Sequence, residues 1–232
     1  MNILGIETST KTGSVAIVSE DGVVAQYSLN IEVTHSERLM STVDRVLKDT
    51  GLAVHDLDGF SVAIGPGSFT GLRIGLSTVK GLALATGKPI AAVPTLQALA
   101  WNLPYSVYPV CPLLDARKNE VYAALYRFAG TALVQVLPET AISIFRLAEQ
   151  ISEKVVFTGE GSLIFRNGIQ EVFGERAVFA PHSAVLPSGA KVAEIGLDMI
   201  KSGRQVEPDR LTPLYIRRPE AEVVWEKKEK SQ

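Results

Sequence analysis

Two carboxylates and a run of hydroxyls stand where an α/β protein could bind or transfer a phosphate. Glu7 ends a short apolar segment near the N-terminus, and the hydroxyls of Thr8 and Ser9 follow it directly. Asp115 ends a second apolar segment about halfway along the chain. Hydroxyls after a strand can donate to phosphate, but they also satisfy the backbone of an ordinary turn. Both interpretations remain open, because the sequence does not establish whether the two carboxylates face one another.

A glycine-rich turn is the second feature with a chemical meaning. Residues 65–75 read Gly-Pro-Gly-Ser-Phe-Thr-Gly-Leu-Arg-Ile-Gly, between an apolar run and a segment with helical spacing. This pattern predicts a strand, a tight turn and a helix capped by Ser68 or Thr70. Such a turn either directs backbone N–H groups toward an anion or needs glycine only to fit. It lacks the lysine of a P-loop and the acidic residue of a dinucleotide fold.

The histidines and the cysteine do not suggest a reactive centre. His35, His55 and His182 have no ligand partner at helical spacing, so we expect no metal site. Cys111 is the only cysteine and lies in an apolar run, which predicts a buried thiol and excludes an internal disulfide.

Composition excludes several classes of protein. Hydrophobic residues make up 46% and charged residues 21%, which is ordinary for a globular chain with a real core. The net charge of -2 provides no basic excess for holding a nucleic acid alone. We expect a cytoplasmic protein, since the sequence shows neither a signal-peptide pattern nor an uncharged stretch of membrane-spanning length.

The elements that would position these residues follow the order βββαβαβ. Asp21 and Gly22 predict a hairpin, and the spacing of Thr34 and Glu37 predicts a capped helix that ends at Gly51. The expected strands are 3–6, 14–18, 23–28, 60–64 and 90–93, and the expected helices are 36–50 and 72–85. Three antiparallel strands followed by alternating helices and parallel strands are typical of half of an actin-like, ribonuclease-H-like fold.

A weaker copy of this order follows Pro104. The expected strands are 107–114, 121–128, 133–137, 155–157 and 177–179, and the expected helices are 143–152 and 188–201. The duplication predicts an α/β protein of two actin-like domains with mixed sheets, 1–105 and 106–232. The charged residues 225–232 are expected to form a flexible tail.

The two helices of the first half carry more apolar and small residues than one sheet needs. Small residues on one face allow another backbone to approach closely, and an exposed apolar helix pair suggests a protein–protein interface. The expected partner-contacting residues are Leu39, Met40, Val43, Gly71, Gly75, Leu76 and Val79. The alternative is that both helices simply cover their own sheet.

Segments 3–9, 35–37, 65–75, 114–117 and 213–217 together resemble the TsaB family, also called YeaZ, and the resemblance runs nearly end to end. It implies a place in the bacterial machinery that installs threonylcarbamoyl on the adenosine beside the tRNA anticodon. In that machinery the paralogue TsaD carries the transferase chemistry with a metal held by paired histidines, and the P-loop ATPase TsaE joins them.

The resemblance implies a scaffold that is not itself an enzyme. TsaD-like proteins have a histidine-rich segment where residues 94–100 of this chain contain no histidine. We therefore expect no cofactor on this chain, with ATP and a metal on partner subunits and tRNA bound only through the complex. The chain would pair with TsaD or with itself. In such a scaffold, Glu7, Thr8, Ser9 and Asp115 would mark a vestigial nucleotide site. The main alternative is an active actin-like small-molecule kinase or nucleotide hydrolase that uses Glu7 and Asp115.

Overall fold

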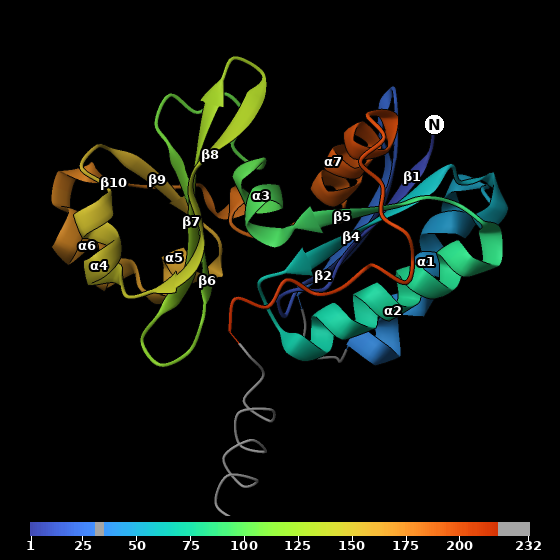
Figure 1. Cartoon of the computed structure of the whole chain (residues 1–232), viewed down its shortest axis with the longest axis horizontal. Helices are drawn as coiled ribbons and strands as arrows, with labels where there is room; N and C mark the ends of the chain where they lie inside the picture. The colour runs from blue at the N-terminus through green and yellow to red at the C-terminus, as the bar shows by residue number, and fades with distance from the viewer. Residues whose placement is uncertain (31–34, 218–232) are drawn as a thin grey trace, which may run out of the picture.

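Two five-stranded mixed sheets form the frame of the computed structural model, which describes residues 1–30 and 35–217 (Figure 1). The first sheet contains β1 (Ile3–Glu7), β2 (Gly13–Ser19), β3 (Gly22–Leu29), β4 (Gly59–Gly65) and β5 (Ile90–Pro94). The second contains β6 (Val110–Asp115), β7 (Val121–Ala129), β8 (Ala132–Ile142), β9 (Val155–Thr158) and β10 (Ala177–Phe179). The strand orders are β3-β2-β1-β4-β5 and β8-β7-β6-β9-β10, so the predicted duplication is confirmed.

Helices cover each sheet in the same way. α1 (His35–Thr50) and α2 (Phe69–Thr86) pack on the first sheet around one apolar core. α4 (Ile144–Gln150) and α6 (Arg166–Phe173) contribute to the core of the second, and α5 (Glu160–Ile164) packs against β6. Gly51 and Gly87 follow α1 and α2 with φ of +70° and +68°, as expected of glycine after a helix. The expected cap at Thr34 lies outside the described residues.

The helix that follows each sheet along the chain packs on the opposite sheet. α3 (Thr95–Ala100) comes after β5 and packs on β6 and β7, whereas α7 (Gly189–Lys201) comes after β10 and packs on β1, β2, β4 and β5. Glycine permits the closest of these contacts, because a Cβ on Gly5 would lie 2.3 Å from the carbonyl oxygen of Gly189. We call each sheet with the helices on its outer side a lobe.

The packing of α3 and α7 on opposite sheets affects the expected division into two domains. Helix α7 lies inside the range 106–232, yet its apolar face is buried against the first sheet. The boundary at residue 105 stays a prediction, and the tail at 225–232 lies outside the described residues. The helices α3, α5 and α6 were not predicted. No helix in the described part of the chain is long and apolar enough to cross a membrane.

Candidate functional site

The turn that follows β1 is buried. Glu7 and Thr8 are 0% exposed and Ser9 is 1% exposed. One carboxylate oxygen of Glu7, Oε1, accepts the backbone N–H of Ser9 at 2.5 Å. The other, Oε2, and the Ser9 hydroxyl are buried without a hydrogen-bond partner among the described residues. Burial raises the pKa of Glu7 from 4.5 to about 7, although the hydrogen bond from Ser9 favours the charged form.

The glycine turn packs directly onto this buried turn. The N–H of Ser68 donates to the carbonyl oxygen of Ser9 at 2.7 Å, and a Cβ on Gly67 would lie 2.3 Å from that oxygen. The Ser68 hydroxyl caps α2 by accepting the N–H of Gly71. The Thr8 hydroxyl donates to the Gly71 carbonyl at 2.8 Å. Two N–H groups that could have faced an anion therefore bind the chain itself. This favours the interpretation that the glycines allow close packing of the turn rather than anion binding.

The strand ends of the second sheet carry a different set of charges. Asp115 is partly exposed, and its Oδ1 accepts the N–H of Arg117 at 2.8 Å. Burial and then the charge of Asp115 raise the pKa of Glu160, while Lys11 and Arg117 act in the opposite direction. Since Lys11 belongs to the turn after β1, the strand ends of the two sheets lie near each other. Glu7 is nevertheless enclosed, whereas Asp115 reaches solvent.

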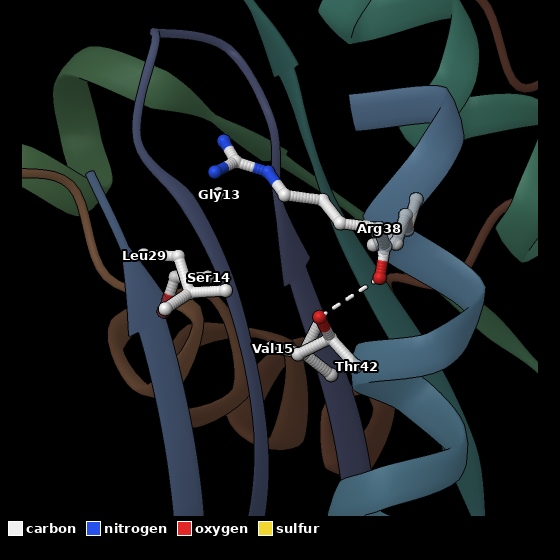
Figure 2. Close-up of a pocket in the computed structure, with 7 residues that line it drawn as sticks. Gly13, Ser14, Val15, Leu29, Arg38 and Thr42 are labelled. Carbon is white, nitrogen blue, oxygen red and sulfur yellow. Dashed lines mark hydrogen bonds between the residues drawn. The ribbon is translucent and has the colours of Figure 1, made fainter. Parts of the chain in front are cut away.

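A small cavity lies beside the buried turn, between β2, the end of β3 and α1 (Figure 2). Its volume of about 10 Å³ is room for about one water molecule. The Arg38 side chain borders it and donates to the carbonyl oxygen of Lys11 at 2.8 Å. The Thr42 hydroxyl donates to the Arg38 carbonyl, as the dashed line in Figure 2 shows. This cavity is far too small for a nucleotide.

Most of the residues expected to contact a partner are buried within this chain. The buried ones are Leu39, Val43, Gly71, Gly75, Leu76 and Val79. Met40 alone of the expected set is exposed, at 54%. Gly75 faces its own sheet, because a Cβ there would lie 2.4 Å from the Thr8 hydroxyl oxygen. These six residues pack against the first sheet in this chain, so their burial disfavours a role in partner contact, which stays a prediction.

The outward face of α2 contains residues that the sequence analysis missed. Ser77, Gly81, Leu84 and Ala85 are exposed and share one side of the helix, and Leu84 is 73% exposed. A Cβ on Gly81 would meet nothing within 4 Å outside the helix backbone. Glycine inside a helix costs about 1 kcal/mol relative to alanine, and the chain's own packing does not explain it here. We call Met40, Ser77, Gly81, Leu84 and Ala85 the helix-pair surface.

The described residues do not form a metal centre. Within 1–30 and 35–217, no three side chains of histidine, cysteine, aspartate or glutamate come together as ligands. Cys111 is buried as predicted, and burial raises the pKa of its thiol.

The family model for "TsaD: tRNA N6-adenosine threonylcarbamoyltransferase" matches residues 22–225. The tRNA threonylcarbamoyladenosine biosynthesis protein TsaB of Bacillus subtilis is 34% identical over 228 residues, which cover 97% of this chain and 98% of that protein. The chain belongs to the TsaB family.

Solved structures agree with membership of the TsaB family. YeaZ from Pseudomonas aeruginosa is 27% identical, has a TM-score of 0.79, and is matched over 92% of this chain and 100% of that one. A ROK hexokinase from Thermus thermophilus has a TM-score of 0.51 at 12% identity, over 88% of this chain and 100% of that one. The second likeness concerns the fold alone, and it confirms the predicted actin-like architecture.

Proposed function

We propose that this chain is a non-catalytic subunit in the biosynthesis of threonylcarbamoyladenosine in tRNA, where it pairs with a TsaD-type transferase and acts together with a TsaE-type ATPase. Membership of the TsaB family supports the process. The observation that supports the non-catalytic role is the closed turn after β1. There the Ser9 carbonyl oxygen accepts the Ser68 N–H, and the Glu7 side chain is buried. A subunit closed in this way acts through its surface rather than through bound substrate.

The alternative function is an actin-like kinase or nucleotide hydrolase. It needs Glu7 and Asp115 beside one bound nucleotide, with backbone N–H groups directed at the phosphates. The burial of Glu7 and the hydrogen bond from Ser68 to Ser9 disfavour that arrangement.

Calorimetry with ATP and Mg²⁺ separates the two functions. We expect no binding in the micromolar range to the isolated chain, and we expect Asp115→Ala to behave like the wild type. Micromolar binding that disappears in both Asp115→Ala and Glu7→Gln would overturn the non-catalytic assignment and place a nucleotide between the strand ends.

The helix-pair surface is our proposed contact with the partner. It offers two large exposed apolar side chains, Met40 and Leu84, on neighbouring helices of one lobe. Gly81 lies one turn before Leu84 on α2, and because nothing occupies the space beside it, another backbone could approach there. Two such helix pairs would form a four-helix arrangement. A TsaD-type paralogue shares the fold, so a homodimer and a heterodimer would compete for this surface.

A charge placed on this surface tests the pairing. The double variant Met40→Glu, Leu84→Glu should bind a TsaD-type protein at least about 30-fold more weakly, because truncated or charged anchors in an interface cost about 2 kcal/mol or more. Cells that rely on this variant should contain less threonylcarbamoyladenosine, measured by mass spectrometry of tRNA nucleosides.

The matched control is Phe145→Glu, which puts the same charge on an exposed apolar residue of the second lobe. We expect it to bind and to support modification normally. If the folded double variant keeps wild-type affinity, the surface is wrongly placed. If cells without the chain retain normal threonylcarbamoyladenosine, the proposed process itself is wrong.

A further inference from the structure

Residues 211–217, here called the strap, run from the first lobe to the second. Figure 1 shows this red segment passing beside α2 and reaching the second sheet. Most of it, residues 213–217, belongs to the segments that resemble the TsaB family, and the proposed pairing gives it no role.

The strap begins as part of the first lobe. Leu211 is buried in the core shared by α1, α2 and the first sheet. Three residues later, the N–H of Leu214 donates to the carbonyl oxygen of Ile64 at 2.7 Å. The carbonyl of Leu214 lies so close to Gly65 that a Cβ there would be 2.7 Å from its oxygen. The strap therefore covers the beginning of the glycine turn.

Tyr215 adds a side-chain anchor on the same lobe. Its ring centroid lies 4.8 Å from that of Phe69, in the first turn of α2. Its hydroxyl oxygen accepts the Nε–H of Arg73 at 3.0 Å. Ring contact and hydrogen bond together fix the strap to the N-terminal end of α2.

The next two residues bind the second lobe. Ile216 packs against the apolar cluster that joins α3 to the second sheet. Arg217 donates to the carbonyl oxygen of Ala116 at 2.9 Å and forms an ion pair with Glu120. Ala116 and Glu120 are the two ends of the turn between β6 and β7, and they are themselves joined by a backbone hydrogen bond of 2.9 Å.

That turn is held in an unusual conformation. Arg117, Lys118 and Asn119 have φ of 63°, 55° and 60°, a left-handed conformation in three successive residues with side chains. Each such residue costs about 1 to 3 kcal/mol and persists only where its surroundings hold it. Arg217 binds Ala116 and Glu120 at the two ends of the turn, so the strap helps to stabilise this conformation.

We propose that the strap is a latch that keeps the two lobes in one relative orientation. Adjacent residues, Tyr215 and Ile216, are fixed to different lobes. From Leu214 to Arg217 the chain advances three residues, which span at most about 11 Å when fully extended. A rotation that separates the strand ends must therefore release one anchor before it can proceed. With both anchors in place, the chain presents its surfaces as one rigid body.

Hydrogen exchange tests the latch in the isolated chain, so the result is separate from partner binding. Arg217→Ala removes the anchor on the second lobe, yet the amide of Leu214 on the first lobe should exchange at least 10-fold faster, because the released strap frays. Arg210→Ala is the matched control, since it removes an exposed arginine from the same C-terminal segment and should leave that amide protected.

A distance between the lobes gives the second measurement. Spin labels at Val24→Cys and Glu149→Cys lie on exposed positions of the two lobes, away from the helix-pair surface, while buried Cys111 stays unlabelled. The distance distribution should broaden in Arg217→Ala and in Tyr215→Ala. In the double variant the distribution should be no broader than in either single variant, because losing one anchor already frees the two lobes to move. If Tyr215→Ala does not fold, Tyr215→Phe removes the acceptor for Arg73 and keeps the ring. Unchanged Leu214 exchange together with an unchanged distribution in folded Arg217→Ala would overturn the latch.

Discussion

Glutamate in place of Val43 should cost the chain about 4 kcal/mol or more and bring it close to unfolding. Val43 is 2% exposed and lies in the first-lobe core. The change forfeits the burial of an apolar side chain and encloses a carboxylate without a partner. Total stabilities of natural domains are only about 5 to 15 kcal/mol. Urea unfolding followed by circular dichroism gives the difference directly.

Met40→Glu is the matched comparison, three residues away on the same helix. Met40 is 54% exposed, so the unfolding free energy of this variant should lie within about 0.5 kcal/mol of the wild-type value. Val43→Ala removes apolar volume without adding charge, so its unfolding free energy should lie between those of Met40→Glu and Val43→Glu. Wild-type stability of Val43→Glu would show that this side chain is accessible after all and would return it to the partner surface.

The stability of the chain should decrease by about 2 to 3 kcal/mol through Glu7 alone as the pH rises from 5 to 8. The folded pKa of Glu7, about 7, lies above the value of 4.5 for the free side chain. Between these pH values the folded state holds a proton that the unfolded state has released. The contribution is therefore fully present below pH 4.5, is lost as the pH rises through 7, and is essentially gone by about pH 8.

Glu7→Gln removes this titration and should flatten the dependence of unfolding free energy on pH, measured with urea at pH 5, 6, 7 and 8. Glu149→Gln, on an exposed residue of the second lobe, should leave the wild-type slope unchanged. Equal slopes for wild type and Glu7→Gln would contradict the enclosed, uncharged state of this carboxyl group at low pH.

Local signals predicted most strands and the long helices. Asp21 and Gly22 marked the hairpin between β2 and β3, and Gly51 marked the end of α1. The helix α3 was missed because its residues are nearly all buried, so it has no polar face to give a helical period. In α5, Leu163 and Ile164 are apolar but exposed, which disrupts the amphipathic pattern there.

The candidate site shows the limit of periodicity more clearly. Spacing identified a face of small residues on α2, including Gly71 and Gly75, but spacing cannot say which neighbour that face meets. The neighbour is the chain's own first sheet, as the contact of Gly75 with Thr8 shows. Glu7 was correctly placed at a strand end. The turn that holds Glu7 is packed against the glycine turn at Ser68, about 60 residues later in the chain, and no local pattern encodes that contact.

The exchange of α3 and α7 between the sheets has a consequence for synthesis on the ribosome. When the first five strands have emerged, one face of their sheet still exposes Ile3, Ala16 and Val18, because the helix that covers them begins only at Gly189. The first sheet of the nascent chain therefore stays uncovered on this face until the last fifth of the chain is made. Exposed apolar surface of this kind is what chaperones bind and what leads to aggregation. Slow translation through the second half should accordingly prolong chaperone association of the first.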